Sequence, residues 1–275
     1  MVRYGGNTAC VEVRCGQHIV IFDGGTGLRP LGKSLLETGD PILADIFYSH
    51  CHLDHVCGLP FFAPLDRATT NLRLWAGNLL PDDSLRKALG RLFSAPLFPD
   101  GTFERLTAGT EFHDFRVGAT LVLSPDIIIK SAPLVHPGGC TGYRLEYHGH
   151  AVAYITDTEH TSDGSLDRNV VELAQNADLL IYDCTFTQEE HSSRIGWGHS
   201  TWEEGIRLAD EASVKTLAIF HHDPAHDDTF LDRLGAQAAV ARPGTTVAAE
   251  GATIRLGGNG ALIAPPRNSS TPSRR

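Results

Sequence analysis

Positive charge is scarce in this chain of 275 residues, which carries 23 Lys and Arg residues against 33 Asp and Glu residues and has a net charge of −10. Proteins hold long nucleic acid mainly by its phosphates, through Lys and Arg side chains, and such an acidic chain has no obvious means of doing so. We therefore expect no long nucleic acid among its partners.

Long hydrophobic runs are also missing. No run approaches the roughly 18 apolar residues that a membrane span needs, and residues 1–6 lack the apolar core of a secretory signal. The six cysteines are scattered through a chain that is large enough to bury a core without disulfide bonds, so we expect reduced thiols. We expect a globular, cytoplasmic protein with no membrane partner, and a homodimer is allowed.

Several predicted strands end directly before a His or an Asp. The apolar run 41–49 predicts a buried strand that leads straight into the segment 50–55. Predicted strands lead in the same way to His136, Asp157 and His221. The other predicted elements are strands at 9–13, 18–22, 71–75, 141–147 and 179–182, and helices at about 31–36, 83–93, 168–176 and 201–212.

The rest of the chain gives weaker signals. Prolines interrupt the span from about 60 to 120, which we interpret as substrate-side loops plus one helix. Ser200 and Glu203 have the spacing of a capping box, which predicts the start of the helix that follows. No apolar period continues beyond 257, so we expect a single domain over 1–257 and a disordered tail over 258–275.

The segment 50–55 concentrates residues that bind metal ions. His50 and His52 point to the same side of an extended chain, and Asp54 and His55 follow where the chain turns into a helix. Four ligands within six residues can serve two adjacent metal ions. Imidazole and carboxylate together suit zinc, and also manganese or iron. A polar loop without metal would leave the placement of the later histidines and aspartate unexplained.

At this point the chain resembles the metallo-β-lactamase-fold hydrolases, whose His-x-His-x-Asp-His motif stands here as residues 50–55. The resemblance covers nearly the whole chain, from the opening Gly5-Gly6-Asn7-Thr8 and the loop 23–27 to the closing strands near 253–256. The resemblance implies an α/β fold, an αββα sandwich of two mixed sheets flanked by helices. It also implies two divalent ions, one bound by His50, His52 and His136, the other by Asp54, His55 and His221, with Asp157 between them.

His222 is an alternative to His221 as the last of these ligands. His222 is adjacent to His221, and successive residues after a strand point in different directions, so only one of them should face the metal ions. We take His221, because its position directly after the strand matches the last ligand of the family.

The later motifs indicate a branch of the family. A carboxylate at Asp157 is similar to the phosphodiesterase and glyoxalase II-like members, whereas lactam-cleaving members carry a Cys ligand near this point. The segments 183–186 and 198–201 resemble those of ribonuclease Z and the phosphonate-pathway phosphodiesterases, which implies that His199 acts as a catalytic acid. The tRNA-clasping arm of ribonuclease Z has no counterpart between Asp157 and His199.

We therefore expect a binuclear metal-dependent hydrolase, most consistent with a phosphodiesterase for a small, sometimes cyclic, phosphodiester. A hydroxide that bridges the two ions would attack the phosphorus, while Asp54 orients it or takes its proton and His199 assists the leaving group. A glyoxalase II-like thioesterase remains an alternative, since it shares the ligand set. A metal-binding sensor or partner module without turnover is the alternative from another class.

Overall fold

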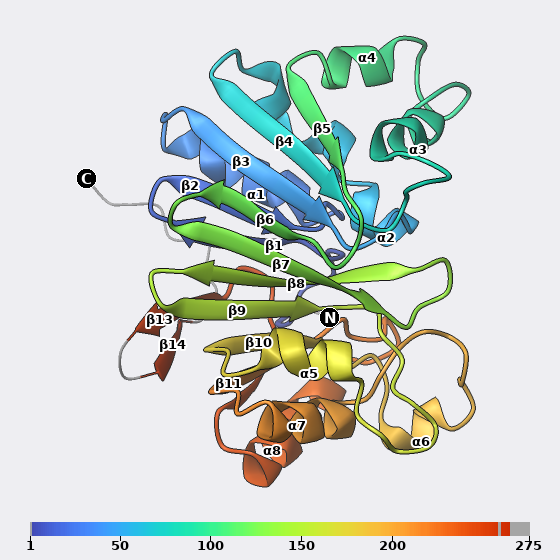
Figure 1. Cartoon of the computed structure of the whole chain (residues 1–275), viewed down its shortest axis with the longest axis vertical. Coiled ribbons are helices and arrows are strands. Elements are labelled where there is room, and N and C mark those ends of the chain that lie inside the picture. Colours follow the sequence, from blue (N-terminus) through green and yellow to red (C-terminus); the bar gives the residue numbers. More distant parts are fainter. Residues whose placement is uncertain (1, 258–259, 265–275) are drawn as a thin grey trace.

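Two β-sheets packed face to face form the centre of the molecule. The computed structural model describes residues 2–257 and 260–264 (Figure 1). The first sheet has the order β1-β2-β3-β4-β5 and the second the order β12-β11-β10-β9-β8-β7-β6. The strands of the first sheet are β1 Val11–Cys15, β2 His18–Phe22, β3 Ile42–Tyr48, β4 Thr70–Ala76 and β5 Thr110–Asp114. Those of the second are β6 Thr120–Ser124, β7 Ile127–Leu134, β8 Cys140–Tyr147, β9 His150–Ile155, β10 Leu179–Asp183, β11 Thr216–Phe220 and β12 Thr245–Val247.

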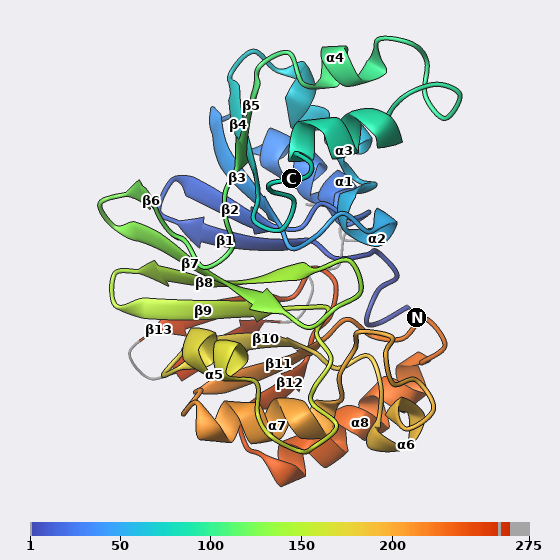
Figure 2. The same ribbon diagram turned by 45° about the vertical axis from the view of Figure 1, so that its right-hand side comes forward.

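Helices cover the outer face of each sheet, so the predicted αββα sandwich is confirmed (Figure 2). Over the first sheet lie α1 Leu28–Glu37, α2 Leu53–Val56, α3 Leu85–Leu92 and α4 Thr102–Leu106, with short 3₁₀ turns at Leu59–Phe61 and Ala63–Asp66. Beside the second sheet lie α5 Arg168–Ala174, α6 Gln188–His191, α7 Trp202–Glu211 and α8 Asp228–Ala241. None of the helices in this described part combines the length and the apolar character that crossing a bilayer requires.

Aromatic side chains fill the layer between the two sheets. Phe22 of β2 stacks on Tyr154 of β9 with ring centroids 5.1 Å apart, and it also stacks on Tyr143 of β8 at 5.6 Å. Phe47 of β3 packs edge-on against Tyr143 at 5.4 Å. All four rings are fully buried. Burial of these large apolar surfaces fixes β3 and β9 relative to each other, and both strands lead into candidate site residues.

The structure also differs from the predictions at several elements. Strand β5 and helix α4 lie in the span that the prolines suggested was mostly loop, and β6 and α8 were not predicted. Helix α7 begins one residue later than the spacing suggested, because the Thr201 side chain accepts the hydrogen bond from the Glu204 amide. Ser200 instead faces inward and binds the Tyr182 hydroxyl.

The expected disordered tail holds a strand within the described residues. Strand β14 Gly260–Ala264 pairs antiparallel with β13 Thr253–Gly257, so the expectation does not hold for that segment. Residues 258–259 and 265–275 lie outside the described residues.

A glycine loop after β2 fixes the position of α2 by direct backbone contact. The Gly24 amide donates to the His55 carbonyl at 2.7 Å, and the Gly58 amide donates to the Gly24 carbonyl at 2.8 Å. A Cβ atom on Gly58 would lie 1.9 Å from the Gly25 carbonyl oxygen, and one on Gly25 would lie 2.2 Å from the Asp54 carbonyl oxygen. Only glycine fits at these two positions, so the loop and the helix come close enough to hold residues 54 and 55 in place.

We predict that Gly58→Ala lowers the free energy of unfolding by about 1–3 kcal/mol, because the added methyl group meets backbone atoms that cannot move aside. Gly109→Ala is the matched control, since its Cβ has open space. Urea unfolding of both variants measures the difference, and equal midpoints would contradict this account of the loop.

Candidate metal centre

The segment 50–55 enters the site from the end of β3. His50 follows the strand after one residue and is 2% exposed. His52 is the N-cap residue of α2 and keeps an extended backbone, while Asp54 and His55 lie in the first turn of the helix. The change from strand to helix within six residues therefore turns all four side chains toward one region.

The three distant residues come from the ends of β7, β9 and β11. His136 follows β7, Asp157 follows β9 and His221 follows β11. Asp157 and His221 have left-handed backbones, with φ values of 52° and 61°. Residues other than glycine rarely adopt this conformation, and when they do it is commonly at functional sites where the surrounding structure holds them.

All seven side chains that the sequence singled out meet at one place. His50, His52 and His136 form one group, and the His136 Nε2 atom lies 3.1 Å from the His52 Nδ1 atom. Asp54, His55 and His221 form a second group, in which Asp54 Oδ2 lies 3.2 Å from His55 Nε2 and 3.6 Å from His221 Nε2. Within each group the candidate ligand atoms lie within 4.8 Å of one another.

Asp157 lies between the two groups and turns one oxygen to each. Its Oδ1 atom is 3.8 Å from the Nε2 atoms of both His50 and His136. Its Oδ2 atom is 3.2 Å from His55 Nε2 and 3.4 Å from His221 Nε2. The Asp157 side chain is only 3% exposed, so its negative charge depends on positive charge from these two groups or from ions that they bind.

The chemistry of the donor atoms fits metal ions. Among the described residues, the buried Nε2 atoms of His50 and His55 have no hydrogen-bond partner. Burial, reinforced by the neighbouring His55, lowers the pKa of His50 to about 2, so its imidazole is neutral and offers a lone pair. A buried nitrogen left without a partner is unfavourable, whereas neutral imidazole nitrogen is a preferred zinc ligand.

The charges of the second group lead to the same conclusion. Burial raises the pKa of Asp157, but the nearby His221 and His55 outweigh it and hold that pKa well below its usual range. Burial lowers the pKa of His221, yet the carboxylates of Asp157 and Asp54 raise it to about 9. The site therefore contains ionised carboxylates that require a cation, and a divalent ion can meet that requirement in place of protonated histidine.

Asp23 orients His55 through a hydrogen bond to Nδ1, the ring nitrogen that does not face the other candidate ligands. Its carboxylate is fully buried and accepts hydrogen bonds from His55 Nδ1 at 2.8 Å, the Ser49 amide at 2.7 Å and the Tyr154 hydroxyl at 2.8 Å. When His55 donates through Nδ1, its Nε2 atom carries the lone pair that faces the site. This contact with Tyr154 could not be predicted from the sequence, because strand alternation cannot show which residue lies opposite on the other sheet.

The other imidazoles are held in a similar way. His136 Nδ1 donates to the Gly198 carbonyl at 2.8 Å, and His221 Nδ1 lies 3.0 Å from the Thr185 hydroxyl. His50 Nδ1 lies 3.0 Å from the Ser49 hydroxyl. His222 does not take part, because its Nε2 atom donates to the Ala248 carbonyl at 2.9 Å instead. The geometry therefore favours His221 over His222.

His199 lies at the edge of the cluster. Its Nδ1 atom is 2.8 Å from Asp183 Oδ2 and 3.9 Å from Asp157 Oδ1. Burial lowers the pKa of His199, but the hydrogen bond to Asp183 and its charge outweigh burial, so the pKa is raised above its ordinary value. The side chain remains 18% exposed, so a ligand can reach it.

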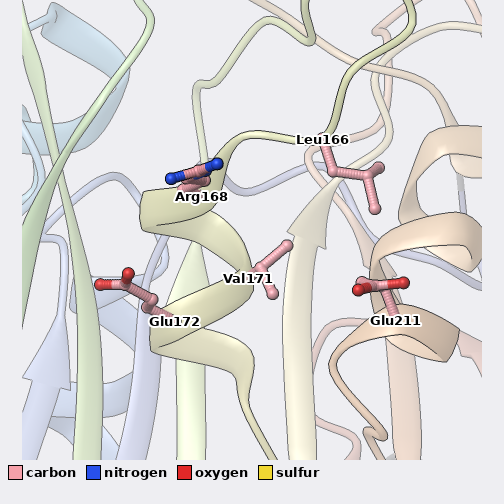
Figure 3. A pocket seen from close by; sticks show the side chains of 5 residues that line it. All are labelled: Leu166, Arg168, Val171, Glu172 and Glu211. Carbon is pink, nitrogen blue, oxygen red and sulfur yellow. The ribbon is translucent and has the colours of Figure 1, made fainter.

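A separate surface hollow carries no comparable chemistry. Its volume is about 240 Å³, and it lies between α5 and α7 (Figure 3). The residues around it are Leu166, Arg168, Val171, Glu172 and Glu211. None of them belongs to the groups of His and Asp side chains described above, so the candidate site is the cluster at the strand ends.

We predict that Asp23→Asn lowers the affinity for zinc about 10- to 100-fold, because an amide cannot accept all of these hydrogen bonds and His55 loses its fixed orientation. Asp45→Asn is the control. Asp45 is equally buried but accepts from Trp75, Arg73 and His18 in the first sheet, so its loss should affect stability and leave zinc affinity unchanged. Competition with a zinc chelator measures both variants. Wild-type affinity in Asp23→Asn would show that this carboxylate does not orient a ligand.

Comparison with known proteins places this site in a family. The model of the beta-lactamase superfamily domain matches residues 18–222. A ribonuclease Z from Synechococcus sp. is 35% identical over 261 residues, which cover 75% of this chain and 79% of the relative. A ribonuclease Z from Archaeoglobus fulgidus is 27% identical over 256 residues, with 78% and 81% covered.

Solved structures show the same fold. The metallo-beta-lactamase fold protein YhfI from Bacillus subtilis has a TM-score of 0.65 and 18% identity, with 94% of this chain and 91% of that chain covered. A diphosphatase of the PhnP family has a TM-score of 0.62 and 19% identity, with 93% and 83% covered. The relatives support the predicted hydrolase class, and the matched domain shows that the chain belongs to the beta-lactamase superfamily.

Proposed function

We propose that this protein is a binuclear metal-dependent phosphodiesterase that acts on a small phosphodiester. The observation that carries the proposal is the position of Asp157, whose two oxygens face two separate groups of candidate ligands. Relatives named ribonuclease Z and a structural neighbour named as a diphosphatase support phosphate-ester chemistry.

The residues divide into two ligand sets around the shared carboxylate. His50, His52 and His136 would hold one ion and Asp54, His55 and His221 the other, with Asp157 serving both. Zinc suits this set of imidazole and carboxylate donors, and manganese or iron is compatible with it. Divalent ions bound there would supply Lewis acidity toward the phosphoryl oxygens and make a water molecule more acidic.

Asp54 is suited to orient the attacking water or to take its proton. Burial raises its pKa, but the neighbouring His221 and His55 outweigh burial and lower it, so the carboxylate is ionised. Its side chain is 43% exposed, unlike the buried Asp157. A water molecule can therefore approach Asp54 from the open side of the site.

His199 is suited to protonate the leaving oxygen. Asp183 accepts from its Nδ1 atom, which leaves the Nε2 atom to face the substrate. The raised pKa of His199 favours the protonated imidazole, which is the form that a general acid requires. Asp183 also stabilises the protonated ring by its charge.

The surroundings of the site favour a small substrate. The whole chain is acidic, with a net charge of −10, which opposes the binding of a long polyanion. In the described chain, the segment from Asp157 to His199 contains only α5, β10 and α6, with no extended arm. Two apolar side chains close to the site in the sequence are exposed: Leu53, between His52 and Asp54, is 62% exposed, and Trp197, two residues before His199, is 61% exposed.

We predict that elemental analysis finds close to two metal ions per chain after growth in metal-replete medium. Asp157→Ala should lose metal and activity together, because both ligand groups lose their shared carboxylate. Asp178→Ala is a control, since that carboxylate pairs with Lys215 and His150 outside the cluster. A full metal content in Asp157→Ala would contradict the shared-ligand arrangement.

We predict that His199→Ala keeps its metal but loses rate, and that the loss depends on the leaving group. Hydrolysis of methyl phenyl phosphate should fall about 100-fold, because phenolate needs a proton, whereas methyl p-nitrophenyl phosphate should be affected much less. Equal losses for both esters would remove the acid role of His199.

Rates of hydrolysis of phosphodiesters and of acyl-thioesters separate the proposed function from its alternatives. An acyl-thioester hydrolysed faster than any diester would favour a glyoxalase II-like thioesterase. Metal-loaded protein that hydrolyses neither class would favour a binding module without turnover.

A further inference from the structure

A nearly buried carboxylate lies two residues after Asp157. Glu159 is 9% exposed. Its Oε1 atom accepts from the Gly196 amide at 2.7 Å. Its Oε2 atom accepts from the Gly198 amide at 2.7 Å and from the Gly196 amide at 3.0 Å. Hydrogen bonds between an ionised carboxylate and backbone amides are stronger than neutral ones. Glu159 therefore fixes both ends of the tripeptide 196–198, which we call the glycine clamp loop.

The glycine clamp loop touches the candidate site at two points. The Gly198 carbonyl accepts from His136 Nδ1 at 2.8 Å, and Gly198 directly precedes His199. A Cβ atom on Gly198 would lie 2.3 Å from His136 Nδ1, so the loop packs directly on that ring. A shift of this loop would therefore move the acceptor of His136 and the backbone of His199 together.

The backbone before Glu159 is tied to the same elements. The Glu159 amide donates to the carbonyl of Val135, the residue before His136, at 2.8 Å. The Thr158 amide lies 3.2 Å from Asp183 Oδ2, the atom that also contacts His199. The segment 157–159 thus joins the carboxylate between the two groups, the β7 end and the partner of His199 into one hydrogen-bonded unit.

We propose that Glu159 is a positioning residue that orients His199 and His136 by holding the glycine clamp loop. This inference rests on the proposed function for the role of His199 as an acid. Its physical basis is the match between two acceptor oxygens and two amide donors. In Glu159→Gln only one oxygen remains, and the new NH₂ group would face an amide hydrogen. One of the two 2.7 Å hydrogen bonds would therefore be lost, and the hold on the loop would weaken.

The kinetic test uses the two esters of different leaving group. If Glu159 acts through His199, Glu159→Gln should lower kcat/KM for methyl phenyl phosphate about 10- to 100-fold and affect methyl p-nitrophenyl phosphate much less. In a His199→Ala background the same substitution should lower the rate for methyl phenyl phosphate far less, because the acid that Glu159 positions is already gone. Equal losses on both esters, or fully additive losses in the double variant, would overturn the proposal.

A second measurement follows the loop without catalysis. Trp197 lies in the glycine clamp loop, so in a Trp75→Phe, Trp202→Phe background it reports on this segment alone. Glu159→Gln should lower its fluorescence anisotropy, and zinc affinity should fall because His136 loses its fixed acceptor. Unchanged anisotropy and unchanged zinc affinity would contradict the proposal.

Glu204→Gln is the matched control. Glu204 is also a buried carboxylate, at 4% exposure, but its partner is Arg207 on α7. It should leave the leaving-group dependence and the Trp197 signal unchanged. If wild-type protein hydrolyses neither ester, the proposed function fails, and Glu159 is then judged by the anisotropy and zinc measurements alone.

Discussion

The two oxygens of one buried carboxylate determine the arrangement of the whole site. Asp157 is almost inaccessible to solvent and has a left-handed backbone two residues after the end of β9. Each oxygen faces a different pair of histidine Nε2 atoms. A buried negative charge is costly unless positive charge or hydrogen-bond donors lie close to it. The convergence of three strand ends on this carboxylate is therefore the feature on which the ligand sets, the charge balance and the proposed chemistry depend.

Groups from different layers of the fold contact the Nδ1 atoms of the imidazoles around Asp157 and fix the orientation of these rings. Asp23 orients His55 from the loop after β2, Thr185 orients His221 from the end of β10, and Gly198 orients His136. Such outer contacts set which nitrogen carries the lone pair. Because these groups belong to both sheets, the aromatic layer between the sheets also supports the site. Packing and candidate chemistry are therefore linked through the same strands.

The sequence predicted the candidate metal ligands better than the residues that hold these ligands in position. His50 to His55 stood out because four ligand types occur within six residues, and His136, Asp157 and His221 stood out because each follows an apolar strand. The roles of Tyr154 and Glu159 depend on contacts across the fold, 131 and up to 39 residues away in the chain. Local periodicity contains no information on such pairs, so only the structure could reveal them.

The prediction of secondary structure from the sequence was limited in the same way. The strongly apolar strands β3, β7, β9 and β11 were predicted. Strands β5 and β6 were missed because they lie in or just after the proline-rich span and are at most partly buried. The start of α7 was placed one residue early, since both Ser200 and Thr201 can cap a helix and the inward contact of Ser200 decides between them.

The most direct test of the central claim is a crystal structure of the zinc-loaded protein with anomalous diffraction at the zinc edge. The account predicts two anomalous peaks, one on each side of the Asp157 carboxylate, with each peak in contact with a different oxygen. A single peak at full zinc loading, or peaks that do not contact Asp157, would contradict it.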